Sequence, residues 1–447
     1  MNTPICDFVR AYAAAGAARL HMPGHKGRGP LGCEAWDITE VTGADDLSHP
    51  EGVILESENN ASALFGTRHT FYSAGGSSQC VKAMLHLALL HRRPEAAPVV
   101  LAGRNAHKAF LHGCALLDLE PRWLLPEEES PLCACPLSPA GLDRALSEQP
   151  APPLAVYLTS PDYLGGMLDI AALAEVCHRH GVPLLVDNAH GAYLRFLSPS
   201  RHPMDLGADL CCDSAHKTLP VLTGGAYLHV SPTAPAPYER EARQAMALFG
   251  SSSPSYLILQ SLDACNLRLA GEYRERLAEV VRRLDELKAK LMDQGVPVRP
   301  GEPLKLVVDG WAASRSGHGL AEDLRRCGVE PEYADPDEVV LMFSADAAER
   351  DFRRVEAAFA SFRSGLRRTP AALPAPGERV LSPRAAMLSP WEEAPVEEAA
   401  GRICAGAAVS CPPAIPIAVS GERITAEAAA LMAELGFQSV SVVRETQ

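Results

Sequence analysis

Short apolar runs alternate with amphipathic stretches between residues 97 and 230. Five runs have the length and composition of strands: APVVLAG, LAVYLTS, VPLLVDN, ADLCCDS and GGAYLHV. Between them, windows such as IAALAEVCHRHG place apolar residues at helical spacing. This alternation is typical of βα units and predicts an α/β fold, with a mostly parallel sheet covered by helices on both faces.

The pattern changes after residue 250. Residues 255–293 predict one long or two broken helices, with leucines at helical spacing. Two strands, at 304–308 and 339–343, have a helix between them, and another helix is predicted at 346–366. These elements predict a second, smaller α/β unit. The last part of the chain ends in an amphipathic helix and a strand-like SVSVV.

These changes in pattern predict four parts of the chain. Residues 1–295 form an N-terminal segment and a large domain, and residues 296–366 a small α/β domain. Residues 367–383 are rich in proline and predict a linker. Residues 384–447 form a C-terminal domain.

Composition narrows the class of protein. A net charge of −14 argues against a nucleic-acid partner, and no apolar run is long enough for a membrane span. The N-terminus lacks a basic start before an apolar stretch, so it does not resemble a signal peptide. The 13 cysteines are odd in number and include no C-x-x-C pair, which argues against a disulfide scaffold or a zinc site. We therefore expect a cytoplasmic protein without a metal.

Polar residues follow the ends of predicted strands. Asp187 comes after the apolar run 182–186, Lys217 lies just past 210–212, and Thr159 ends LAVYLTS. The carboxyl ends of parallel strands meet at one edge of a sheet, where binding sites collect. Pyridoxal phosphate (PLP) needs a lysine for a Schiff base and a carboxylate that keeps its ring nitrogen protonated. Taken alone, an aspartate and a lysine at this spacing are more often a structural buried ion pair or two unrelated surface residues.

A glycine–serine turn, GGSS at 75–78, separates the apolar FYSA from the helical QCVKAMLHLALL. The start of a helix offers unpaired N–H groups and the positive end of the helix dipole. Gly76, Ser77 and Ser78 therefore predict a phosphate cradle, although a turn that only caps a helix has the same sequence.

Further candidates lie beside these residues. His107 follows the strand VVLAG, where an imidazole could stack on a pyridine ring or be an ordinary histidine of the core or surface. Ser214 and His216 flank Lys217 and could bind a phosphate or orient the lysine. Lys108 is a rival for the Schiff base, but Lys217 follows the aspartate in the expected order.

A longer series of motifs resembles the Orn/Lys/Arg decarboxylase family, in particular its shorter bacterial branch without an N-terminal receiver-like domain. The matching segments stand in family order and cover most of the chain: HMPGHKGRG, DITEVTGADDLSHPEGVI, RNAHKA, TSPDYLGGMLDI, VDNAHGAY, GADLCCDSAHKTLP, SSSPSYLILQSLD, SPRAAM, EEAAGR, CPPAIP and SGERIT. So many ordered matches are more specific than any one of them.

The resemblance implies a fold-type I, aspartate-aminotransferase-like PLP enzyme with its active site at a homodimer interface. It implies Lys217 as the Schiff base, Asp187 on the pyridine nitrogen and His107 stacked on the ring. It also implies His190 near the cofactor's phenolic oxygen. The other implied cofactor contacts are Gly76, Ser77, Ser78, Thr159, Ser214, His216, and Ser252 or Ser253 of the partner subunit.

The implied reaction is loss of CO2 from arginine, lysine or ornithine to give a di- or polyamine, with Lys217 or His107 returning a proton to Cα. A basic side chain needs an acidic partner, because an unpaired cation is costly to desolvate. The candidates, each of which could equally be a surface acid, are Asp45, Asp46, Glu397, Glu398 and Glu422.

Several positions depart from the family pattern and allow an altered specificity or a slower enzyme. Gly75 replaces the usual Asn of the cradle, Asn188 a Glu, Tyr193 a His, Gly224 a Gln and Cys411 a Tyr.

Two other classes remain open. An aminotransferase or lyase of the same fold shares the aspartate and lysine, and an aminotransferase needs an arginine for the substrate carboxylate, for which Arg384 and Arg402 are candidates. A regulatory paralogue would bind the cofactor without releasing CO2.

Overall fold

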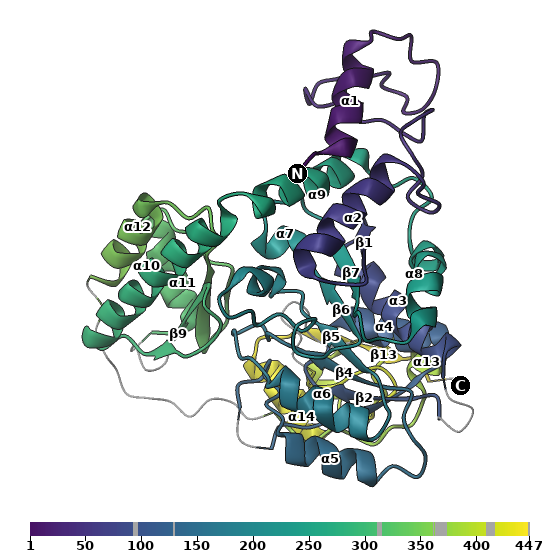
Figure 1. Ribbon diagram of the computed structural model, residues 1–447. Coiled ribbons are helices and arrows are strands. Elements are labelled where there is room, and N and C mark those ends of the chain that lie inside the picture. The colour runs from purple at the N-terminus through teal and green to yellow at the C-terminus, as the bar shows by residue number, and fades with distance from the viewer. Residues whose placement is uncertain are drawn as a thin grey trace. The chain divides into compact units, whose positions relative to one another are not determined.

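The computed structural model describes residues 1–92, 97–127, 130–310, 315–360, 362, 373–407 and 416–445 (Figure 1). The chain divides into two compact units. The first comprises Met1–Ala102, Pro139–Thr159 and Asp169–Arg274. The second comprises Gly103–Ser138, Ser160–Leu168 and Glu275–Gln447.

The first unit holds six strands of the central sheet, in the order β1-β7-β6-β5-β4-β2. Strands β2, β4, β5 and β6 are parallel, which confirms the predicted α/β fold. They read as continuous apolar runs because both faces are buried. The strands are β1 (His69–Ser73), β2 (Val99–Gly103), β4 (Ala155–Thr159), β5 (Leu184–Asp187), β6 (Leu210–Asp213) and β7 (Ala226–Val230).

Strand β7 runs antiparallel to both of its neighbours, β1 and β6. Hydrophobic periodicity predicted the GGAYLHV strand but carries no information about its direction. The helices of this unit include α3, which packs against α8, and α2, which packs against α1 and α9. They are α1 (Pro4–Ala14), α2 (Val53–Phe65), α3 (Ser77–Leu90), α5 (Pro139–Ser147), α6 (Ile170–Arg179), the 3-10 helix η1 (Ala192–Phe196), α7 (Ala215–Thr218), α8 (Ala236–Phe249) and α9 (Tyr256–Ala270).

The second unit contains an antiparallel sheet in the order β10-β11-β9-β8. Helices α10, α11 and α12 lie together beside β9 (Figure 1). Both strands predicted here are confirmed within a residue of their predicted ends. The elements are α10 (Tyr273–Asp293), β8 (Val298–Arg299), β9 (Lys305–Asp309), α11 (Gly317–Arg326), β10 (Tyr333–Ala334), β11 (Glu338–Met342) and α12 (Glu349–Phe359).

The same unit contains α4 (Lys108–Leu117), β3 (Glu120–Leu124) and the C-terminal elements. The latter are α13 (Pro383–Met387), β12 (Trp391–Pro395), η3 (Val396–Glu398), α14 (Ala426–Glu434) and β13 (Ser439–Val443), so the predicted final helix and strand are confirmed. Strands β12 and β13 pair antiparallel. Part of the predicted linker, residues 367–372, lies outside the described residues, and the predicted domain boundaries stay a prediction.

The twelve cysteines among the described residues are all free thiols. In that same part of the chain, no helix has both the length and the apolar composition needed to cross a bilayer.

Candidate active site

The carboxyl ends of three neighbouring strands bring candidate residues into one row. Thr159 at the end of β4 pairs with Asp187 at the end of β5. Asp187 in turn pairs with Cys212 of β6, whose last residue precedes Ser214 and the short helix α7 that carries Lys217. The parallel register therefore places these residues at one edge of the sheet.

Asp187 is held in a fixed orientation. Its side chain is 3% exposed, and one carboxylate oxygen accepts a hydrogen bond from the Tyr157 hydroxyl at 2.9 Å. The other oxygen accepts from the backbone N–H of Ala189 at 3.2 Å. Tyr157 is not among the site residues predicted from the sequence. A tyrosine inside an apolar strand was the available signal, because a buried hydroxyl needs a partner.

Lys217 is half-buried and lies beside a buried histidine. Its Nζ is 3.1 Å from Nε2 of His190, which follows Asp187 by three positions. His216 hydrogen-bonds the carbonyl of Gly225 through Nδ1 at 3.0 Å. Burial lowers the pKa of His216, and the neighbouring Lys217 lowers it further. The lysine and both histidines therefore lie in one partly desolvated group.

The predicted cradle lies at the start of α3. Gly76 precedes the helix with a φ of +68°, and no side chain among the described residues caps it. The Ser214 hydroxyl donates to the Ser77 hydroxyl at 2.8 Å, which joins the two candidate phosphate contacts. An uncapped helix start with two hydroxyls suits a phosphate group.

A further observation supports the fit with PLP. Thr159 Oγ1 is buried and has no hydrogen-bond partner within the described part of the chain. A buried hydroxyl of this kind is costly unless a ligand pairs with it. With the lysine, the carboxylate and the uncapped helix, the residues of this edge fit PLP.

Two departures from the family pattern have a structural reason. A Cβ at Gly75 would lie 2.8 Å from Oε1 of Gln79, which accepts a hydrogen bond from Ser73. The carbonyl of Gly224 accepts from the N–H of Gly76 at 2.8 Å, and Gly224 has a φ of +95°. Glycine at both positions therefore lets the backbone approach the cradle closely. Cys411 lies outside the described residues.

In the second unit, His107 is the N-cap of α4. Its Nδ1 accepts a hydrogen bond from the backbone N–H of Ala109 at 3.1 Å, so in the neutral ring Nε2 carries the hydrogen. At the other end of α4, Arg384 donates to the carbonyls of Ala115 and Leu116 at 3.1 and 3.2 Å. Contacts within the unit therefore fix both ends of this helix.

The prediction that Glu422 could bind the basic end of the substrate is wrong, because the side chain of Arg104 already binds its carboxylate. Arg104 donates to its two carboxylate oxygens at 2.6 and 2.7 Å, and both side chains are buried. Asp45 accepts from the backbone N–H groups of Glu51, Gly52 and Ile54. These bonds outweigh burial and lower the pKa of Asp45, which fits a structural role in its loop.

The remaining acidic candidates are accessible. Glu397 and Glu398 are exposed on η3, and Asp46 is half-buried, with its carboxylate accepting from the Ser48 N–H at 2.8 Å. Ser252 and Ser253 are exposed in the loop before α9. The predicted roles of these acidic residues and of the two serines stay predictions.

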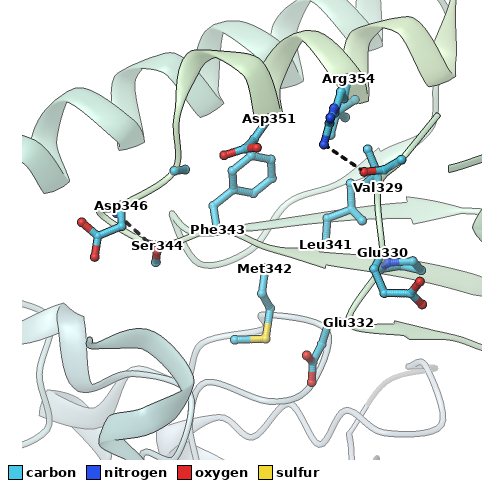
Figure 2. A pocket seen from close by; sticks show the side chains of 14 residues that line it. Val329, Glu330, Glu332, Leu341, Met342, Phe343, Ser344, Asp346, Asp351 and Arg354 are labelled. Atoms are coloured by element: carbon cyan, nitrogen blue, oxygen red, sulfur yellow. Dashed lines mark hydrogen bonds between the residues drawn. The ribbon is translucent and has the colours of Figure 1, made fainter. Parts of the chain in front are cut away.

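A separate cavity of about 530 Å³ lies in the second unit, beside β11 and α12 (Figure 2). Glu330, Glu332, Asp346 and Asp351 give it an acidic lining, and the nearby Arg354 donates to the Gly328 carbonyl at 3.4 Å. None of the site residues predicted from the sequence lines it.

Comparisons with known proteins match the chain along most of its length. The family model "Orn/Lys/Arg decarboxylase, major domain" matches residues 3–312, and the model of the family's C-terminal domain matches residues 372–439. The chain is 30% identical to the uncharacterized protein YaaO of Bacillus subtilis, over 97% of this chain and 94% of that protein. It is 27% identical to an arginine decarboxylase of the same organism, over 95% and 92%.

Among solved structures, lysine decarboxylase A from Pseudomonas aeruginosa superimposes with a TM-score of 0.80 at 18% identity. The match covers 99% of this chain and 80% of that one. At this identity the likeness shows the fold.

Proposed function

The chain belongs to the Orn/Lys/Arg decarboxylase family and is a PLP-dependent amino-acid decarboxylase, and from this premise we propose that it releases CO2 from a basic amino acid, with Lys217, Asp187 and His107 in the active site. The observation that carries the proposal is the convergence of Lys217, Asp187 and Ser214 at the carboxyl edge of the sheet. When bound, PLP supplies an electron sink for the bond that breaks at Cα.

The residues at the carboxyl edge of the sheet have different roles in this proposal. Lys217 would attach the cofactor, and the Tyr157 hydroxyl holds the Asp187 carboxylate, which would pair with the protonated ring nitrogen. Gly76, Ser77, Ser78, Ser214 and His216 would hold the phosphate near the start of α3, with Thr159 as a further contact. Ser252 of the partner subunit would complete the phosphate site.

The step after CO2 loss needs a proton at Cα. Lys217 Nζ can donate it, because His190 Nε2 lies 3.1 Å away and can exchange a proton with that amine. His107 is the second candidate, since its neutral ring carries the hydrogen on Nε2.

The competing aminotransferase activity lacks support from its candidate arginines. Arg384 binds the carbonyls at the end of α4. Arg402 binds Glu392 at 2.7 Å and the Val443 carbonyl at 3.3 Å. Both guanidinium groups therefore serve the fold of the second unit.

Arginine is the first substrate to test. The relative named arginine decarboxylase matches along 95% of this chain, and its name describes such a reaction. The product would be a diamine or polyamine precursor, formed in the cytoplasm. Asp46, Glu397 and Glu398 stay the candidates for binding the basic end of the substrate.

A homodimer is also part of the proposal. The N-terminal segment exposes large apolar side chains, with Leu20 at 92% and Leu31 at 83%, and Met22 and Trp36 are exposed as well. A segment that exposes several large apolar side chains is typical of an interaction surface. Light scattering coupled to size exclusion tests this, and a stable, active monomer would contradict the shared active site.

The test of the activity is CO2 release from arginine, lysine, ornithine and neutral amino acids in the presence of PLP. We expect one basic substrate to react and Lys217→Ala to lose at least about a thousandfold in rate, because the attaching amine is gone. Lys108→Ala is the matched control: Lys108 is exposed on α4 and should leave the rate unchanged. A cofactor-loaded protein that releases no CO2 from any substrate would instead favour a regulatory paralogue.

A further inference from the structure

A buried hydrogen-bonded centre lies directly behind the candidate active site. Asp213, the last residue of β6, is fully buried. One of its carboxylate oxygens accepts from Nε2 of His202 at 3.0 Å and of His229 at 3.1 Å. The other accepts from the Asn188 amide at 2.7 Å and faces the Cys211 thiol at 3.8 Å. We call these five residues the Asp213 centre.

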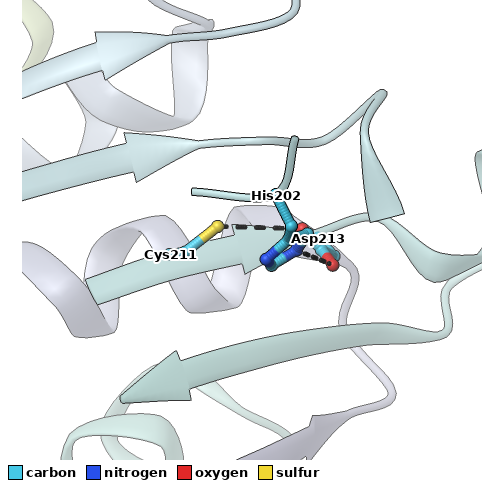
Figure 3. A group of neighbouring side chains, drawn as sticks. All are labelled: His202, Cys211 and Asp213. Atoms are coloured by element: carbon cyan, nitrogen blue, oxygen red, sulfur yellow. Dashed lines mark hydrogen bonds and ion pairs between the residues drawn. The ribbon is translucent and has the colours of Figure 1, made fainter. Parts of the chain in front are cut away.

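The Asp213 centre includes atoms that could bind a metal. His202, Cys211 and Asp213 place ligand atoms within 4.8 Å of one another (Figure 3). Each of those atoms already makes a hydrogen bond, and burial raises the pKa of Cys211, which keeps the thiol protonated. A metal needs the thiolate. The three candidate ligand atoms are therefore already engaged in hydrogen bonds, whereas the buried Oδ1 of Asn188 has no partner among the described residues.

The Asp213 centre joins the end of β5, which carries Asp187, to the end of β6, which leads into the helix of Lys217. Asn188 directly follows Asp187 at the end of β5. Asp213 directly precedes Ser214, which hydrogen-bonds Ser77 in the cradle. The hydrogen bond from the Asn188 side-chain amide to Asp213 therefore connects the residue next to Asp187 with the residue next to Ser214.

Asn188 gives the Asp213 carboxylate a neutral hydrogen-bond donor. Position 188 carries an amide in this chain. An acid at 188 would face the Asp213 carboxylate inside a dry site, where two neighbouring carboxylates cannot both stay ionised. Asn188 avoids this conflict because its Nδ2 donates to the carboxylate.

We propose that Asp213 is a positioning residue: its carboxylate, matched to the Asn188 amide, fixes the placement of Asp187 relative to Lys217. This inference rests on the proposed roles of Asp187 and Lys217. It extends the site by a layer of buried residues next to the proposed catalytic ones, and it gives the amide at position 188 a role.

The test is a cycle of three isosteric variants: Asn188→Asp, Asp213→Asn and the double exchange. Asn188→Asp puts two carboxylates in contact, so we expect a loss of about tenfold in PLP affinity, within the range of coupling between touching residues. The pH midpoint of the absorbance of the lysine-bound cofactor should move as well. In the double exchange the amide and the carboxylate trade places, and affinity and midpoint should return to within about threefold of wild type.

Three results would overturn the inference. In the first, the single variants lower the melting temperature of the cofactor-free protein but leave PLP affinity and the absorbance midpoint unchanged, which indicates a structural role only. In the second, the double exchange is as impaired as Asn188→Asp. In the third, mass spectrometry finds a stoichiometric metal in the wild-type protein.

The cycle separates this inference from the proposed function. Wild-type protein that binds PLP but releases no CO2 would defeat the decarboxylase proposal. PLP affinity and the absorbance midpoint would still decide the role of Asp213.

Discussion

The two units stabilise a buried carboxylate in different ways. In the first, the Asp213 centre surrounds one carboxylate with donors from several elements. In the second, the Glu422 carboxylate depends mainly on one guanidinium, that of Arg104. Arg104 also lies over the Trp123 ring, 4.9 Å from its centroid, and donates to the Pro416 carbonyl at 3.1 Å.

The two buried carboxylates differ in how many side chains donate hydrogen bonds to them. A carboxylate with several donors keeps most of its solvation when one is lost, whereas a bidentate pair leaves a full charge buried when either partner is removed. The Arg104–Glu422 pair also connects residues that are 318 positions apart in the chain. Arg104 lies three positions before His107, so the pair holds the segment that contains this histidine. We therefore expect a single substitution to affect the second unit more severely.

The largest effect should come from Glu422→Ala. This variant leaves the Arg104 guanidinium buried without its partner, which costs about 3–5 kcal/mol. The expected result is a melting temperature lowered by several degrees and a cofactor-loaded enzyme with reduced activity.

A double variant, Arg104→Met with Glu422→Leu, sharpens this result. Replacing both charges by apolar side chains of similar volume should recover most of the stability lost in Glu422→Ala. If the double variant is as unstable as the single one, the cost lies in packing rather than in the uncompensated charge.

A smaller effect is expected from His229→Phe in the Asp213 centre. The ring volume stays, one donor to Asp213 is lost, and Asn188 and His202 remain. The cost should be about 1–3 kcal/mol. Thermal unfolding of this variant beside Glu422→Ala measures the contrast directly, and an equal or larger loss in His229→Phe would contradict the argument from redundancy.

Buried carboxylates of the two units also respond differently to pH. Burial would raise the pKa of Asp213, but His202 and His229 outweigh it and hold that pKa well below its ordinary range. Its stabilising charge is therefore present above the unfolded pKa of about 3.9 and is lost only as the pH falls through its lower folded value.

Glu338 shows the opposite behaviour. Burial raises its pKa to about 7, against the opposing charge of Arg299. The folded protein therefore takes up a proton in the window below pH 7, where the unfolded chain is still ionised, and gains stability as the pH falls. Wild-type protein should gain melting temperature relative to Glu338→Gln between pH 8 and pH 5.5. A difference that stays constant over this range would show that Glu338 remains ionised.

The sequence predicted which residues gather at this edge of the sheet because the signals for strand ends are local. The strand ends and the residues that follow them gave Thr159, Asp187 and Lys217, and the structure places them at one edge. The Asp213 centre was missed although a charged residue inside the apolar run ADLCCDS signals a buried partner. The identity of that partner could not be predicted, because His202 and His229 reach Asp213 only through tertiary packing.

The second unit was harder to predict for the same reason. Glu422 stands in a loop motif that reads as an accessible acid, and only the fold shows its contact with Arg104, 318 positions away. Arg384 likewise resembled a substrate clamp until its carbonyl partners were known. Residues that act through long-range contacts leave no periodic signal in the sequence.

The smallest effect should come from Arg384→Ala. The side chain is exposed, and water can replace its bonds to the last carbonyls of α4, so the loss should be about 0.3–1 kcal/mol. Because His107 caps the opposite end of α4, CO2 release should fall by less than about fivefold, with Arg353→Ala as the control for removing an exposed arginine. A loss in Arg384→Ala comparable to that of Glu422→Ala would mean that α4 is held from its carboxyl end, and that the buried Arg104–Glu422 pair is not the principal anchor of the His107 segment.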